Sequence, residues 1–236
     1  PQLSLGWGIE EAKRCVEMVE ADALAVHMNP LQEAVQVGGD TSYSGVLEKV
    51  RQLADALDTP IVMKETGCGV AYEEAVKLEE AGAAAVDVSG VGGTSWSAVE
   101  YHIAKEVGER DQEHLGQALW SWGIPTAVSV VETSQSTGLK VISSGGVRTG
   151  VEIAKSIALG ADAAGMAKPF LEKAVEGRDQ LAEYVDHILQ ELRVVMFLTG
   201  ARDVAALGSV PALVMGRTAE WLGLRGFDVS KYAERP

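Results

Sequence analysis

The sequence predicts an α/β protein of the (β/α)8 TIM-barrel class, with about five of the eight strand-helix units present. Short apolar runs alternate with amphipathic helical patterns along the chain. Polar and glycine-rich segments follow these runs, at the strand ends where parallel α/β folds place their sites. An open doubly wound sheet shares both features, but phosphate-type turns after the last two strands favour the barrel.

The expected strands are apolar along their whole length, which predicts a parallel sheet covered on both faces. They lie at residues 22–27, 60–64, 83–89, 139–144 and 161–166. Helical patterns lie at residues 9–20, 44–57, 71–81, 97–107, 149–159 and 178–198. We therefore expect residues 1–236 to form one partial barrel domain, in which a helical tail with a helix near 211–223 begins at about residue 200.

The first three strand-helix units of a barrel are missing from this pattern. The chain opens on Pro1-Gln2-Leu3 without an initiator methionine, so we expect it to be roughly the carboxyl-terminal two-thirds of a longer protein. Five strands leave unpaired edges at residues 22–27 and 161–166. The isolated chain is therefore expected to be aggregation-prone or partly molten.

Composition excludes several classes of function. Of the 236 residues, 34 are acidic and 20 are basic, so the net charge is −14, and neither nucleic acid nor an anionic membrane is expected as a partner. No apolar run approaches the roughly 18 residues of a membrane span, and no signal peptide opens the chain. Cys15 and Cys68 form no zinc or disulfide pattern. We expect a soluble homo-oligomer of the reducing cytoplasm.

Two segments near the end of the barrel predict a phosphate site. Residues 143–148 (SSGGVR) end one expected strand, and residues 166–170 (MAKPF) end the next, with Pro169 suited to the first turn of a short helix. Paired glycines let backbone N–H groups approach an anion closely, and Arg148 and Lys168 could neutralise its charge. The alternative is an ordinary glycine turn. A second glycine segment, residues 90–96 (GVGGTSW), is weaker evidence of the same kind.

Lys64 stands at the carboxyl end of an apolar strand, where an ammonium group needs a negative partner. Such a lysine can stabilise negative charge on a cofactor, and the alternative is a structural ion pair with Glu33 or Asp87. The densest polar cluster, residues 27–33 (HMNPLQE), follows the first strand. Glu33 could give one oxygen to Mg²⁺, whose other positions substrate phosphates and water would fill.

Together these motifs resemble type 2 isopentenyl-diphosphate isomerases, in their archaeal form. The resemblance spans essentially the whole chain, and the cluster at 27–33 is its most specific part. The motifs that carry it are His27-Met28-Asn29-Pro30-Leu31-Gln32-Glu33, Val62-Met63-Lys64-Glu65, Gly92-Gly93-Thr94-Ser95-Trp96, Ser144-Gly145-Gly146-Val147-Arg148-Thr149-Gly150 and Ala167-Lys168-Pro169-Phe170.

The resemblance implies an FMN- and Mg²⁺-dependent enzyme that interconverts isopentenyl and dimethylallyl diphosphate in isoprene biosynthesis, its flavin reduced by NAD(P)H. The implied catalytic residues are Gln32, Lys64 and His27. Gln32, His27 and Asn29 would bind the substrate, and Glu33 would bind the metal. The flavin would be held by Lys64, Thr94, Gly145, Gly146, Arg148, Ala167 and Lys168, with Glu100 a weaker candidate for its neighbourhood. Because an amide is neither acid nor base at neutral pH, reduced flavin would move the protons, its N5 the donor, while Lys64 tunes its charge.

Two alternatives remain open. An FMN-dependent 2-hydroxy-acid oxidase or dehydrogenase would share the phosphate segments, but such enzymes typically carry an active-site histidine and a Ser-Asn-His-Gly-Gly stretch, and residues 88–94 contain no histidine. A non-catalytic fragment is the other possibility, and retention of yellow flavin on purification would distinguish it.

Overall fold

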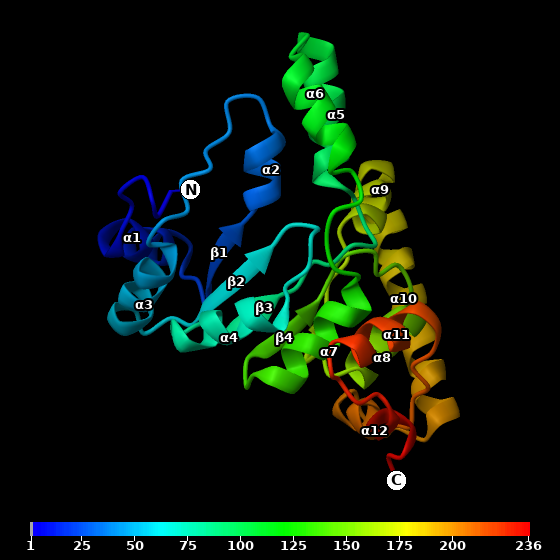
Figure 1. The fold of residues 1–236 in the computed structure, drawn as a ribbon. Helices are drawn as coiled ribbons and strands as arrows, with labels where there is room; N and C mark the ends of the chain where they lie inside the picture. Colours follow the sequence, from blue (N-terminus) through cyan, green and yellow to red (C-terminus); the bar gives the residue numbers. More distant parts are fainter. Residues whose placement is uncertain (1) are drawn as a thin grey trace.

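The computed structural model describes residues 2–236, and its centre is a single parallel sheet (Figure 1). The five strands follow one another in space in chain order, β1-β2-β3-β4-β5. They are β1 (Leu24–Met28), β2 (Ile61–Glu65), β3 (Ala85–Asp87), β4 (Lys140–Ser143) and β5 (Ala163–Ala164). Each lies within one predicted run or extends one residue past it. The α/β class and the incomplete barrel are thus confirmed.

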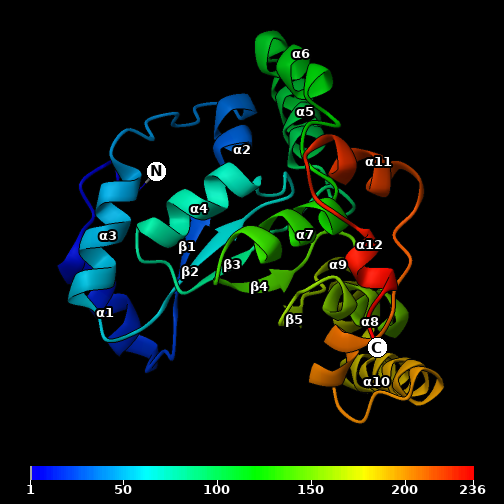
Figure 2. The same cartoon turned by 60° about the horizontal axis from the view of Figure 1, so that its bottom comes forward.

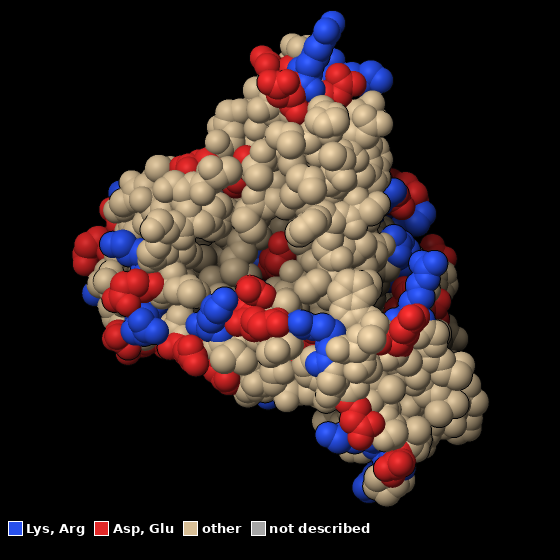
Figure 3. Space-filling view, viewed as in Figure 1, with Lys and Arg blue, Asp and Glu red and all other residues tan. Residues whose placement is uncertain are grey.

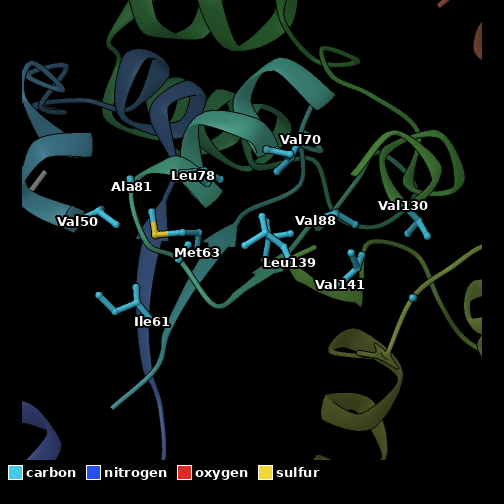
Figure 4. Packing of buried hydrophobic residues seen from close by; sticks show 14 of the residues in the cluster. Val50, Ile61, Met63, Val70, Leu78, Ala81, Val88, Val130, Leu139 and Val141 are labelled. Atoms are coloured by element: carbon cyan, nitrogen blue, oxygen red, sulfur yellow. The ribbon is translucent and has the colours of Figure 1, made fainter. Parts of the chain in front are cut away.

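The helix-covered face of the sheet holds the core. Ile61 and Met63 of β2 and Val86 of β3 are at most 1 % exposed, and they pack with Val88 and Val141 in one cluster (Figure 4). Side chains alternate between the two faces of a strand, so Val62 and Lys64, between the buried residues of β2, point to the opposite face. Burial of each such aliphatic side chain contributes about 1.5–3 kcal/mol to folding.

The opposite face, which would line the inside of a closed barrel, is open. In β1 the residues on this face, Ala25 and His27, are exposed, whereas Leu24 and Val26 are partly buried. Figure 2 shows α4, α7 and α8 gathered on one side of the sheet, with no helix of residues 2–236 across the other. The expectation that both faces are covered was wrong for this chain, because five strands form an arc that does not close over its own interior.

The six amphipathic helices predicted from periodicity are present. They are α1 (Ile9–Val19), α3 (Val46–Ala56), α4 (Tyr72–Glu80), α5 (Trp96–Val107), α8 (Gly150–Ala158) and α10 (Arg178–Thr199). The short helix expected at Pro169 is α9 (Lys168–Glu176). None of the helices within residues 2–236 combines the length and apolarity needed to cross a bilayer.

Four helices of the described residues were not predicted from the sequence: α2 (Pro30–Val35), α6 (Arg110–Ala118), α7 (Thr126–Ser136) and the short α12 (Ser230–Ala233). The six residues 128–133 of α7 are all buried, polar ones included, so the helix lacks the one-sided apolar stripe that reveals surface helices. α5 and α6 form a hairpin that projects beyond the carboxyl ends of the strands (Figure 1). Gly116 permits its close packing, since a Cβ there would lie 2.9 Å from Tyr101.

The tail packs on the outside of α7. It comprises a 3₁₀ turn (Ala205–Ser209), α11 (Gly216–Leu224) and α12 (Ser230–Ala233), so the helix expected near 211–223 begins five residues later. Leu222 and Tyr232 are buried against Val128 and Val131 of α7. Arg225 donates to buried Glu132 at 3.1 Å, which ties the tail to the barrel by an ion pair.

Candidate functional site

The ends of β1, β2 and β3 bring three titratable side chains into one row. His27 lies opposite Lys64, and Lys64 opposite Asp87, in the strand register. Lys64 Nζ is 3.3 Å from Asp87 Oδ2. Of the two partners that the sequence left open, Glu33 and Asp87, the structure thus pairs Lys64 with Asp87. The lysine side chain remains 44 % exposed, against 13 % for the aspartate, so a ligand can still reach the ammonium group.

His27 lies beside this ion pair. Desolvation lowers the pKa of its imidazole, and the positive charge of Lys64 lowers it further. Thr66 Oγ1 lies 3.3 Å from Nδ1 of the ring and donates to the Met28 carbonyl at 3.2 Å. Because its proton is used on that carbonyl, the hydroxyl oxygen can accept from the imidazole N–H. In that tautomer the other ring nitrogen is an acceptor.

Asn29 connects the polar residues that follow β1. It is the N-cap of α2, with Pro30 at the first helical position, and is only 7 % exposed. Its Nδ2 donates to Glu33 Oε1 at 3.1 Å and lies 3.4 Å from Gln32 Oε1. The one-turn spacing of α2 places both side chains against the cap residue. The structure therefore brings together Asn29, Gln32 and Glu33, as the resemblance implies.

Gln32 is held from its other end by Glu100. Its Nε2 donates to Glu100 Oε1 at 2.9 Å, and Glu100 is 5 % exposed within α5. The resemblance makes Glu100 a weaker candidate for the flavin's neighbourhood, and in the structure its carboxylate contacts Gln32. With oxygen and nitrogen both engaged, the orientation of the Gln32 amide is fixed.

The surroundings of Glu33 suit a metal that takes few protein ligands. Its Oε2 accepts from Gln36 Nε2 at 2.6 Å and from the Asp40 N–H at 2.9 Å, whereas Oε1 accepts only from Asn29. Within residues 2–236 no group of three or more His, Cys, Asp and Glu side chains could hold a metal by itself. One free carboxylate position fits Mg²⁺ that is otherwise bound by diphosphate and water.

Glu65 is a further buried carboxylate, whose role was not predicted from the sequence. It is 6 % exposed on the helix side of β2 and accepts from the Cys68 N–H at 2.6 Å. Desolvation raises its pKa to about 7, although N–H groups of residues 66–69 oppose the shift. Those residues carry Thr66, the neighbour of His27. Glu65 thus stabilises the turn that supports the imidazole.

The two glycine turns pack directly on each other. A Cβ at Gly145 would lie 2.1 Å from Gly90 O, and one at Gly146 would lie 2.3 Å from Gly92 O. Both Gly145 and Gly146 have positive φ angles, 98° and 90°. Glycine is therefore required here by backbone packing as well as by any ligand. Ser95, and not Thr94, caps α5 by accepting from the Ala98 N–H; Thr94 is exposed.

The two cations of the predicted phosphate site lie at the β4–β5 end of the sheet. Arg148 donates to Gly92 O at 3.0 Å and to Gly146 O, so its guanidinium spans both glycine turns. Lys168 begins α9 after Ala167, and its Nζ is 3.6 Å from Glu172. β4 and β5 are neighbours, which places these groups beside Gly145 and far along the sheet from Glu33. An elongated ligand with an anionic end and a ring near Lys64 fits this layout.

A cavity of about 1570 Å³ lies on the other, helix-covered side of the sheet. Leu24, Val26 and Met63 line it, and so does His27, whereas Gln32, Glu33 and Lys64 do not. It is the hollow in Figure 3 between the α1–α3 side and the rest of the molecule. Of the polar residues of the predicted site, His27 thus borders this cavity, and Gln32, Glu33 and Lys64 lie outside it.

Comparison with known proteins gives one family and many relatives. The sequence model of the family described as FMN-dependent dehydrogenase matches residues 10–212. Proteins named isopentenyl-diphosphate delta-isomerase match 96 % of the chain at 47 % identity in Methanothermobacter thermautotrophicus and at 48 % in Thermococcus kodakarensis. The chain spans 63 % and 60 % of their lengths.

Solved structures agree with the fold. A mandelate oxidase bearing a monooxide FMN adduct matches 89 % of the chain with a TM-score of 0.58 at 21 % identity, and the chain covers 62 % of it. A GMP reductase from Trypanosoma brucei matches 85 % with a TM-score of 0.57, also at 21 % identity, and the chain covers 43 % of it. At this identity the similarity concerns the barrel fold alone.

Proposed function

Because the chain belongs to the FMN-dependent dehydrogenase family, we propose that it is the larger part of an FMN- and Mg²⁺-dependent isomerase that converts isopentenyl diphosphate to dimethylallyl diphosphate. The observation that supports this most is the joined cluster of Asn29, Gln32 and Glu33, in which Gln32 is oriented by Glu100. The relatives at 43–48 % identity that carry the isomerase name support the same activity.

The residues divide the work along the carboxyl edge of the sheet. Glu33 Oε1 would hold one position on Mg²⁺, and His27 and Asn29 would line the diphosphate side. Gln32 contacts the reacting end of the substrate without exchanging protons, because an amide does not titrate at neutral pH. Lys64, paired with Asp87, stabilises negative charge on the ring beside it. Gly145, Gly146, Arg148, Ala167 and Lys168 hold the flavin phosphate, and Thr94 lies beside it.

Double-bond migration adds a proton to one carbon and removes another from its allylic neighbour, with no net redox change. When bound, reduced FMN supplies the group that gives and takes these protons. We propose NAD(P)H as the source of the reduced state, the cytoplasm as the compartment and a homo-oligomer as the assembly. A 2-hydroxy-acid oxidase is a poorer fit, because Ser89 to Gly93 offers no histidine where such enzymes carry one.

The direct test is conversion of isopentenyl diphosphate by protein produced from its complete coding sequence. The assay contains FMN, Mg²⁺ and either NADPH or dithionite, and the product is dimethylallyl diphosphate. Glu33→Gln should remove most activity while FMN content stays unchanged. The control is Glu106→Gln, an exposed residue near the end of α5, which should keep full activity. Equal loss of flavin and activity in Glu33→Gln would show that Glu33 is structural, and oxidation of 2-hydroxy acids without isomerisation would favour the oxidase.

A further inference from the structure

The segment between α2 and α3 folds back over the polar cluster at the end of β1. Residues 36–43 supply three hydrogen bonds to it, two of which are those of Gln36 and Asp40 to Glu33 Oε2. Asp40 is itself fixed, since its Oδ1 accepts from the Ser42 N–H at 2.8 Å. The third comes from Tyr43, whose hydroxyl donates to Asn29 Oδ1 at 3.1 Å.

The Tyr43 bond decides which way the Asn29 amide faces. A primary amide has one accepting end and one donating end. With Oδ1 held by the tyrosine hydroxyl, Nδ2 faces Glu33 Oε1 at 3.1 Å and Gln32 Oε1 at 3.4 Å. A flipped amide would put its oxygen against both of these acceptors. At 7 % exposure Asn29 has little access to water that could replace a lost partner.

Burial raises the pKa of the Tyr43 hydroxyl, and the negative charges of Glu33, Asp40 and Glu65 add to the shift, although the backbone of Asn29 opposes it. The shift favours the protonated phenol, which is the form that donates to Asn29 Oδ1. Its ring borders the apolar cavity, so a phenylalanine can occupy the same space and only the hydroxyl is lost.

We propose that Tyr43 is a positioning residue for the metal and diphosphate end of the site: its hydroxyl sets the orientation of Asn29, and Asn29 holds Glu33 Oε1 and Gln32 in place. This inference rests on the proposed function. Residues 36–43 contain none of the predicted site residues, and the proposal gives this segment a role in metal binding. Since Oε2 of Glu33 already accepts two hydrogen bonds, Oε1 is the atom whose position Tyr43 controls through Asn29.

The test measures metal binding apart from catalysis. Mn²⁺ takes oxygen ligands as Mg²⁺ does, and its bound fraction can be read by electron paramagnetic resonance. Protein from the complete coding sequence is titrated with Mn²⁺ in saturating isopentenyl diphosphate, and isomerase activity is measured separately. Tyr43→Phe should weaken Mn²⁺ binding by about three- to tenfold, the effect of one hydrogen bond, and leave the FMN dissociation constant unchanged.

Two further variants separate positioning from a general loss of stability. Tyr232→Phe, in the tail, also removes a tyrosine hydroxyl, which donates to Leu159 O at the end of α8, and should leave Mn²⁺ binding unchanged. In an Asn29→Ala background, Tyr43→Phe should have no further effect, because Tyr43 acts through Asn29. Additive losses, or unchanged Mn²⁺ binding in Tyr43→Phe, overturn the proposal. A third outcome is that Tyr43→Phe weakens Mn²⁺ binding as expected but the wild-type protein does not isomerise isopentenyl diphosphate. That outcome would overturn the proposed function and not the positioning role of Tyr43.

Discussion

Gln32 Nε2 and Glu100 Oε1 lie 2.9 Å apart although 68 residues separate them in the chain. The contact joins α2, at the end of β1, to α5, at the end of β3, across the intervening strand. It fixes the amide that we assign to the substrate, so its loss should affect catalysis before it affects folding.

We therefore expect Glu100→Ala to lower kcat of the isomerisation by about tenfold, because one charged hydrogen bond to a neutral partner is worth about 1.5 kcal/mol. Glu100→Gln keeps an oxygen that can accept from Gln32, so this variant should lower kcat much less. Steady-state kinetics of both variants, with FMN content as a control, make the comparison. Equal kcat values for the two variants would mean that the acceptor does not matter.

The raised pKa of Glu65 predicts that the stability of the folded protein depends on pH. Its pKa in the folded protein is raised from 4.5 to about 7, so the folded state binds the proton more tightly than the unfolded state does. This contribution to stability is complete below about pH 4.5 and is lost as pH rises through about 7. We therefore compare the free energy of unfolding of Glu65→Gln with that of wild type at each pH. The variant's value minus the wild-type value should be higher at pH 8 than at pH 5, by roughly 3 kcal/mol.

Urea unfolding of both proteins at the two pH values measures this difference, and other titrating groups cancel in the comparison. A difference between variant and wild type that is the same at pH 5 and pH 8 would show that Glu65 does not titrate in this range.

Lys168 should matter for flavin affinity. Its only ion pair within residues 2–236 is the exposed contact with Glu172 at 3.6 Å, which contributes little, so its charge is available to a phosphate. Lys168→Glu should weaken FMN binding at least tenfold, about 1.4 kcal/mol, because attraction becomes repulsion. Lys173→Glu, on the last turn of the same helix, is the control. Flavin fluorescence titration measures the FMN dissociation constant of each variant. Equal dissociation constants for Lys168→Glu and Lys173→Glu would contradict the placement of the phosphate.

The strands and amphipathic helices could be predicted from sequence because their signal is local. The contact partners of individual side chains could not be predicted, because they depend on tertiary packing. Lys64 had two candidate carboxylates, and only the register of β2 against β3 selects Asp87. The link from Glu100 to Gln32 depends on how α5 packs against α2. Tyr43 carried no motif signal, since its contact with Asn29 exists only once the loop has folded back.

The glycine turns show a different limit. From sequence, the glycines at 92–93 and 145–146 indicated a phosphate site. In the structure they also allow one turn to pack on the other, with Gly145 against Gly90 and Gly146 against Gly92. A glycine pair read from sequence cannot distinguish a ligand contact from a backbone contact, because both require the absence of a Cβ.

The last prediction concerns the 236-residue chain produced by itself. The sheet has two edges without a partner strand among residues 2–236, β1 and β5, and the inner face of β1 is exposed at Ala25 and His27. Unpaired strand edges and exposed apolar surface favour association with other chains. Phe197, Leu198 and Val175, on the helices next to β5, are 74–82 % exposed. We expect this chain alone to aggregate or to bind a hydrophobic dye and unfold without a cooperative transition. Intact-mass analysis and thermal unfolding test this together: a mass near 24.9 kDa with a sharp, cooperative transition would show that five strand-helix units are stable without further covering.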